Sequence, residues 1–431
     1  MHLSTIPKTI PSSRTKQALL LEQDIPHIYL GQGLIFVPPM SSREWYEAYL
    51  KTQWVDPSEY PLATIQRKWA PGEIYNSPTL DTLRQQIQQE QYIDGYRRPE
   101  SFGKFVQPIS NQTVADLYQL DPQHITTIQT DNLMQALRSA LKIIAKVKNK
   151  KVTHIILPDA YVYSGHTDFV SSFVDIGLDL QIRHIPAVTI DGQQDMDQLE
   201  QLCTHIKNTD GLALLIDQEH NTNASGYDRD GSQNAQMSGV LQAYSEHIVY
   251  MGDNAYKGLK ERLHEPYPLM QQLVADEILA FHYTSFSKIG NYRGTPSYAN
   301  ILAATPWSDI SYDDLQSSFQ QIQRSEGIGA TADWALLMSQ LIHDPEFVRE
   351  VEVIRHYIWY TRDALRDGLA GTALENLFGQ QTHGIFRCLP DPYIAHLNSG
   401  DTQVITVWSR INIRPLGDPE MRELFLEKVR D

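Results

Sequence analysis

The sequence predicts an α/β protein in which a parallel or mixed sheet is covered by helices on both faces. Between residues 125 and 300, short β-branched runs of nearly continuous apolar character alternate with stretches of helical periodicity. This alternation is typical of buried strands that are joined by helices. The expected strands are 125–128, 152–157, 180–185, 212–216, 247–251 and 278–281.

The C-terminal part of the chain indicates a second, smaller domain. Beyond the last expected strand the periodicity becomes helical, with a long helix from Pro345 to about Leu369 and a final helix from Pro419. Two alternating stretches between these helices, 384–389 and 404–408, are typical of strands and make the domain α+β. The expected organisation is an N-terminal arm with part of the small domain over 1–65, a large domain over 66–308 and a small C-terminal domain over 309–431.

Composition and charge exclude several classes of function. The formal net charge of −16 argues against non-specific nucleic-acid binding, and no cluster of basic residues offsets it. No window reaches the roughly 18 apolar residues of a membrane span, and the first residues lack a signal-peptide core. Cys203 and Cys388 have no metal-type spacing and suit a reducing compartment. We therefore expect a cytoplasmic protein without a metal site.

A lysine just past a predicted core strand gives the first chemical clue. Lys288 follows the run 278–281, is preceded by Ser285 and Ser287, and has Arg293 five positions further on. Desolvation at a strand end lowers the pKa of a lysine toward that of a nucleophilic amine. Hydroxyls and a guanidinium can hold a phosphate. The combination indicates a Schiff base with the phosphorylated aldehyde pyridoxal 5′-phosphate. The alternative is a surface loop that happens to contain a lysine and an arginine.

Polar residues also follow other predicted strands, at the edge where ligands bind in such sheets. Asp253 follows the strand 247–251, where a carboxylate can pair with the pyridine nitrogen of the cofactor or merely cap a helix. Tyr256, just beyond, can hydrogen-bond the phenolic oxygen of the ring. Asn221 follows 212–216 and can donate to the same oxygen, although an Asn-rich turn explains it nearly as well.

Three further features suit a ligand less specifically. An aromatic residue after the second predicted strand, either Tyr161 or Tyr163, can stack on a flat ring or pack in the core. The first predicted strand runs directly into a helix N-terminus, whose N–H groups suit a phosphate, while Asp131 is equally an ordinary N-cap. The pair Gly31 and Gly33 can let the backbone approach a ligand or simply form a turn.

Four blocks, in this order, resemble the fold-type-I aminotransferases that use pyridoxal phosphate, and among them the aspartate and aromatic amino-acid group. They are Gln129-Thr130 with Ala136-Leu137-Arg138, His220-Asn221, Asp253-x-Ala255-Tyr256-x-Gly258 and Ser285-x-Ser287-Lys288. A fifth block, Ser409-Arg410-Ile411-Asn412-Ile413, resembles the late arginine with which this family grips the substrate α-carboxylate. The resemblance runs from about residue 28 to the C-terminus.

The resemblance implies a large domain with a mixed, mostly parallel seven-stranded sheet between helices, a smaller α+β domain, and a homodimer with shared active sites. It implies an enzyme that moves the α-amino group of an L-amino acid to a 2-oxo acid through a Schiff base on Lys288, with Asp253 and Tyr256 as further catalytic residues. The implied cofactor-binding residues are Tyr92, Asn132, Leu133, Tyr161, Asn221, Asp253, Tyr256, Ser285, Ser287, Lys288 and Arg293, and the implied substrate-binding residues are Gly33, Asn221 and Arg410.

Departures from the family pattern leave other reactions open. The family has glycine, serine or threonine where this chain has residues 132–134, so only backbone N–H groups remain there for the phosphate. Asn221-Thr222 replaces the family's Asn-Pro, and no arginine matches the one that recognises a dicarboxylate side chain. The alternative is an oxidase, hydroxylase or lyase on the same fold, acting on a cationic amino acid such as arginine that Asp217 and Glu219 would meet. A binding protein without turnover is a third possibility, against which the retained lysine, carboxylate and late arginine argue.

Overall fold

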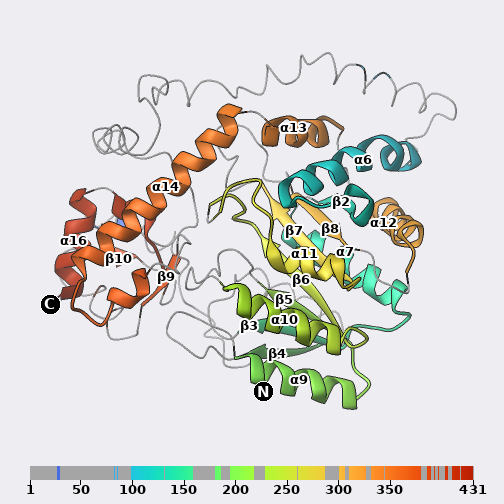
Figure 1. Cartoon of the computed structure of the whole chain (residues 1–431), viewed down its shortest axis with the longest axis horizontal. Coiled ribbons are helices and arrows are strands. Elements are labelled where there is room, and N and C mark those ends of the chain that lie inside the picture. Colours follow the sequence, from blue (N-terminus) through green and yellow to red (C-terminus); the bar gives the residue numbers. More distant parts are fainter. Residues whose placement is uncertain are drawn as a thin grey trace.

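The computed structural model shows a central sheet between helices and a smaller group of helices and short strands beside it (Figure 1). The structure describes residues 27–29, 82, 85, 99–130, 132–158, 180–185, 195–217, 229–259, 261–286, 300–305, 310–326, 332–343, 345–379, 386–389, 393, 397, 403–405, 410–417 and 419–430.

The large sheet has seven strands in the order β2-β8-β7-β6-β5-β3-β4. All neighbouring pairs are parallel except the two that involve β8, which runs against both β2 and β7. This confirms the expected mixed, mostly parallel sheet. The strands are β2 (Thr126–Thr130), β3 (His154–Pro158), β4 (Gln181–Ile185), β5 (Ala213–Asp217), β6 (Ile248–Asn254), β7 (Ala280–Ser285) and β8 (Asn300–Ala304).

The strand that the sequence did not predict is β8, the one that runs against the others. Its apolar part, 301–304, is short and half alanine, which has low β-propensity, and Pro306 follows closely. It lies between β2 and β7 and is buried at residues 301–304, so the tertiary environment decides its conformation. Most of the predicted strands, such as 212–216 and 278–281, are instead marked by runs of Ile, Leu, Val and Phe, as expected for strands buried on both faces.

Two separate cores cover the two faces of the sheet. One core contains Val249 and Met251 of β6 with side chains of α7 and α12, and we call this side the α7 face. The other contains Tyr250 with side chains of α9, α10 and α11, and we call it the α10 face. Since successive strand residues point to opposite faces, each strand position can be assigned to one side. The helices are α6 (Pro99–Tyr118), α7 (Leu133–Val147), α9 (Met196–Asn208), α10 (Gly231–Ala243), α11 (Pro268–Ala275), α12 (Tyr312–Glu326), α13 (Ala332–His343), α14 (Pro345–Gly368) and α16 (Pro419–Arg430).

The smaller group lies at the left of Figure 1, where α14 and α16 lie beside short strands. The strand β9 (Phe386–Cys388) pairs antiparallel with β11 (Arg410–Asn412). The strand β1 (His27–Tyr29), far away in the sequence, pairs parallel with β10 (Gln403–Ile405). The single-turn helices are η4 (Pro122–His124), η5 (Glu375–Phe378) and η6 (Arg414–Gly417).

Within the described residues, no helix is long and apolar enough to cross a bilayer. Among the same residues, no group of three or more His, Cys, Asp or Glu side chains is arranged to hold a metal ion. Burial raises the pKa of the Cys203 thiol to about 12, so this cysteine stays protonated and unreactive at neutral pH.

Candidate active site

The carboxyl end of β6 places Asp253 on the α7 face of the sheet. Val249 and Met251 lie in the core on that face, and Asp253 continues the same alternation two residues further on. Its side chain is 7% exposed, and the N–H of Ala255 donates to its Oδ1 at 3.2 Å. The segment that follows is a turn and not a helix, so Asp253 is not a helix cap. The carboxylate is therefore nearly buried at the edge where this type of sheet binds ligands.

The neighbouring strand β7 brings Ser285 to the same face. Phe281 and Tyr283 lie in the core of the α7 face, and Ser285 follows in the same alternation. Tyr283 is the register partner of Asp253, so Ser285 lies one side-chain step beyond it. Ser285 is 3% exposed. A carboxylate and a hydroxyl from adjacent strands thus share one face at one edge of the sheet.

The helix α7 begins at this same edge. Its N-cap is Asn132, not Asp131, which lies outside the described residues: Asn132 Oδ1 accepts from the N–H of Gln135 at 3.0 Å. The N–H groups of Leu133 and Met134 precede the first bond that an α-helix can close. These groups and the helix dipole favour an anion. The side chain of Asn132 caps the helix, so backbone N–H groups are what the start of α7 offers to an anion.

Thr130, which the sequence analysis names as part of a motif but not as a site residue, lies beside this helix start. It ends β2, is 1% exposed, and its Oγ1 has no hydrogen-bond partner among the described residues. The register places Thr130 opposite Asn300, which is itself opposite Ser285, so the three lie in one row across the sheet. Ile128 lies in the core of the α7 face, and Thr130 therefore points to that face too. Its place between a strand and a helix start was the signal available in the sequence.

Beyond Asp253 the chain turns sharply, which explains the glycine of the motif. Gly258 has φ of +89°, a conformation that L side chains rarely adopt, and a Cβ there would lie 2.9 Å from Val351 Cγ1 of α14. Tyr256, in the same turn, is 7% exposed and packs in the core of the α10 face. Ala255 contacts both cores, so the turn carries the chain across the end of the sheet.

Several predicted site residues lie outside the part of the chain that the structure describes. They are Gly33, Tyr92, Tyr161 with its competitor Tyr163, Asn221, Ser287, Lys288 and Arg293. The backbone of Arg410 is described: it begins β11, directly opposite Cys388. The structure therefore brings together Asp253, Ser285 and the start of α7 at residues 132–133.

The expectation that Asp217 belongs to an acidic patch for a cationic substrate is wrong. Asp217 ends β5 with no exposed surface, and its Oδ2 accepts hydrogen bonds from Arg229 Nη2 and, at 2.7 Å, from the Tyr250 hydroxyl. It is directed to the α10 face, opposite Asp253, because Leu215 of the same strand lies in that core. Its charge is neutralised within the fold, and Glu219 lies outside the described residues.

Comparisons with known proteins bear on the fold. No protein-family model matches the sequence, and no curated protein shows significant sequence similarity to it. Solved structures do match, and three of them do so over 100% of both chains. They include an aromatic-amino-acid aminotransferase from Burkholderia pseudomallei covalently bound to pyridoxal phosphate (TM-score 0.64, 16% identity), an aspartate aminotransferase from Trypanosoma cruzi (0.63, 16%) and a psychrophilic aromatic amino acid aminotransferase from Psychrobacter sp. B6 cocrystallised with aspartic acid (0.65, 15%). The chain therefore has the fold of the fold-type-I aminotransferases.

Proposed function

We propose that this protein is a pyridoxal-phosphate-dependent aminotransferase that moves the α-amino group of an L-amino acid to a 2-oxo acid. The observation that carries the proposal is the meeting of Asp253, Ser285 and the start of α7 on one face of the sheet. A carboxylate for a ring nitrogen, beside a hydroxyl and a helix N-terminus for a phosphate, is the donor set that this cofactor requires. The fold, shared over the full chain with aminotransferases, adds support by analogy.

The described residues would divide the binding of the cofactor between them. Asp253 would accept from the protonated pyridine nitrogen, and the N–H groups at the start of α7 with the hydroxyl of Ser285 would bind the phosphate. When bound, pyridoxal phosphate supplies the electron sink for the substrate Cα. The buried, water-poor position of Asp253 strengthens its hold on that ring proton.

The remaining roles rest on the sequence. Lys288, three residues beyond the end of β7, would bind the cofactor covalently and then move the proton at the substrate Cα. Tyr256, from the turn that carries the chain across the end of the sheet, and Asn221 would donate to the phenolic ring oxygen. Tyr161 would stack on the ring, and Arg410 would bind the substrate α-carboxylate through its planar fork. The remaining proposed ligands are Gly33, Tyr92, Ser287 and Arg293.

We propose a cytoplasmic homodimer whose two active sites are shared, with Tyr92 reaching the phosphate bound by the partner subunit. The proposed domain boundaries stay at 1–65, 66–308 and 309–431. The pairing of β1 with β10 fits an N-terminal segment that contributes to the small domain. Sedimentation of the purified protein with and without cofactor tests the proposed homodimer. We expect a dimer in both conditions.

Absorbance of the cofactor-loaded protein tests the proposed reaction. With an amino acid under anaerobic conditions, the visible band of the bound cofactor should give way to the near-ultraviolet band of its amine form, and a 2-oxo acid should restore it. In a parallel experiment in air, oxygen uptake with release of ammonia would instead identify an oxidase. Absence of a spectral response to all proteinogenic amino acids would contradict turnover. The buried, paired state of Asp217 removes this residue from the acidic patch that favoured a cationic substrate.

We propose that the buried hydroxyl of Thr130 also binds the phosphate. Thr130→Val should then weaken binding of pyridoxal phosphate about tenfold or more, because one hydrogen bond to a charged group contributes roughly 1.5 kcal/mol or more. Valine keeps the shape of threonine but removes the buried hydroxyl that has no partner among the described residues. Equilibrium binding measured with pyridoxal, which lacks the phosphate, should not change.

Ser139→Ala is the matched control, because Ser139 Oγ is also buried without a partner in the described part of the chain but lies further along α7, away from its start. This variant should bind pyridoxal phosphate like the wild type. Equal affinity of Thr130→Val and the wild type would exclude a contact between Thr130 and the phosphate.

A further inference from the structure

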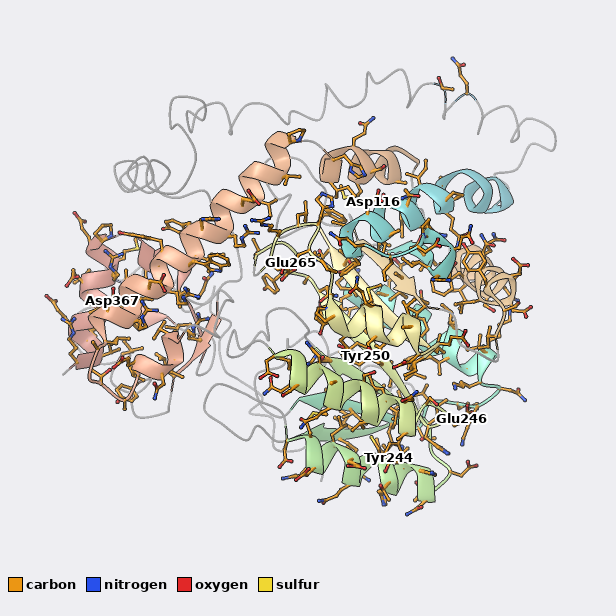
Figure 2. All side chains as sticks on the ribbon, viewed as in Figure 1. Asp116, Tyr244, Glu246, Tyr250, Glu265 and Asp367 are labelled. Atoms are coloured by element: carbon orange, nitrogen blue, oxygen red, sulfur yellow. The ribbon has the colours of Figure 1, made fainter. Side chains whose placement is uncertain are left out.

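A buried ionic cluster lies on the α10 face, behind Asp253. Arg229 Nη2 donates to Asp217 Oδ2 and, at 3.1 Å, to the hydroxyl of Tyr267. The hydroxyl of Tyr250 donates to the same oxygen of Asp217 at 2.7 Å, and Arg229 Nε donates to Asn234 Oδ1 at 3.3 Å. In Figure 2, Tyr250 is seen between the ribbons of α10 and α11, whose side chains share its core. We call Asp217, Arg229, Tyr250 and Tyr267 the rear cluster.

The rear cluster joins four elements through one guanidinium and one carboxylate. Asp217 ends β5, Tyr250 lies within β6, Asn234 lies in the first turn of α10, and Tyr267 is the N-cap residue of α11. The planar fork of an arginine donates in several fixed directions at once, which the point charge of a lysine cannot do. The relative positions of these four elements are therefore specified by directional bonds as well as by apolar packing.

Burial makes the cluster hard to break. The side chain of Asp217 has no exposed surface and that of Arg229 is 11% exposed. Burial by itself would lower the pKa of Arg229, but the charge of Asp217, with contributions from Tyr267 and Tyr250, raises it well above its usual value. Removing one partner of such a pair leaves an uncompensated charge in the interior, which is strongly destabilising. The rear cluster therefore holds these four elements of the large domain in fixed relative positions.

The sheet register places the rear cluster directly behind Asp253, on the other face of the sheet. Asp217 is the register partner of Gly252, and Asp253 is the next residue along β6, directed to the opposite face. Tyr250 stands two residues before Gly252 on the same strand and contacts the same carboxylate. The cluster therefore holds the last part of β6 from two positions, one on the strand and one beside it.

We propose that the rear cluster is a positioning device that fixes the end of β6 and so sets the direction in which Asp253 meets the ring nitrogen of the cofactor. The inference rests on the proposed function. Asp217, Arg229 and Tyr250 act from the far face of the sheet through the backbone of β6. They are positioning residues and not catalytic ones. A tilt of a nearly buried carboxylate weakens a charge-assisted bond whose strength depends on geometry.

Tyr250→Phe is the sharpest test, because it removes one hydrogen bond to Asp217 and keeps both charges and the aromatic packing. We expect pyridoxal phosphate to bind about three- to tenfold more weakly, as for the loss of one hydrogen bond. We also expect a shift in the pH midpoint of the visible absorbance of the bound cofactor, because Asp253 governs protonation of the ring. Arg229→Lys, which keeps the charge and loses the fork, should act in the same direction.

A double-mutant cycle separates positioning from general loss of stability. In an Asp253→Asn background the side chain at position 253 has no charge left to be positioned. Tyr250→Phe should therefore have little further effect on cofactor affinity or on the pH midpoint of the absorbance. Lys150→Met is the matched control. It breaks a 2.6 Å ion pair with the exposed Asp210, in the loop that precedes β5, and should change neither quantity.

Each outcome decides a different claim. Wild-type affinity and an unshifted midpoint in both Tyr250→Phe and Arg229→Lys would refute the positioning role, as would effects that simply add to that of Asp253→Asn. A wild-type protein that binds no pyridoxal phosphate would refute the proposed function itself. Thermal unfolding of every variant is recorded beside the binding data, and Tyr250→Phe, the mildest change, keeps the test valid if Arg229→Lys does not fold.

Discussion

Lys288→Ala should yield a folded protein that binds pyridoxal phosphate without a covalent bond and converts no amino acid. Lys288 is the proposed covalent partner of the cofactor and the proposed base at the substrate Cα. The base alone accounts for a factor of about 10² to 10⁴ in rate. Absorbance of the loaded variant should lack the visible band of the covalent form. A single-turnover experiment with stoichiometric amino acid measures the loss of the reaction.

Lys257 is the control for this prediction, because it is the lysine nearest to Asp253 in the sequence. Its side chain has no exposed surface, its Nζ lies 3.2 Å from Glu261 and 2.6 Å from the carbonyl of Glu265, and it lies 4.9 Å from the ring centroid of Tyr118. These contacts occupy its amine within the fold. Lys257→Met should lower stability and keep the covalent cofactor. The reverse pattern in the two variants would overturn the assignment of Lys288.

Asp253→Asn should lower kcat by about 10² to 10⁴-fold, the range for a group that controls protonation at a reacting centre, with a smaller change in KM. Asparagine keeps the size of aspartate and its hydrogen bond from Ala255, but it has no negative charge to hold a proton on the ring nitrogen. Steady-state kinetics with the best amino acid found by the absorbance screen measure this loss.

Asp210→Asn is the matched control for this substitution. It makes the same chemical change at an exposed carboxylate, where Lys150 lowers the pKa of Asp210 by hydrogen bonding and by its charge. Its kcat should equal that of the wild type. A turnover within a factor of about three in Asp253→Asn, far below the expected loss, would show that the carboxylate at the end of β6 does not act on the cofactor.

Much of the large domain could be predicted from the sequence because its signals are local. Buried parallel strands are continuous apolar runs, so β3, β5, β6 and β7 are recognisable one at a time. The same apolar runs led to Asp253 and Ser285, which lie just beyond the ends of two of them. Strand alternation then gives their common face without further information.

Features that depend on distant partners could not be predicted in this way. The sequence suggests that Asp217 meets a cationic substrate because the partners of its carboxylate are not local. Tyr250 is 33 residues away and Arg229 lies across a connecting segment. Thr130 can be recognised as a site residue only from the strand register, which aligns it with Ser285 through β8. The sequence did not predict β8. Both cases require knowledge of which strands are neighbours, and that order is set by the whole fold.

Reductive trapping tests the central claim most directly. The full-length protein is incubated with pyridoxal phosphate, reduced with borohydride to make any imine permanent, digested and mapped by mass spectrometry. The account predicts one modified lysine, Lys288, with the modification prevented by prior removal of the aldehyde with hydroxylamine. Modification of Lys257 instead, scattered labelling of surface lysines at equal levels, or no labelled peptide at all would contradict it.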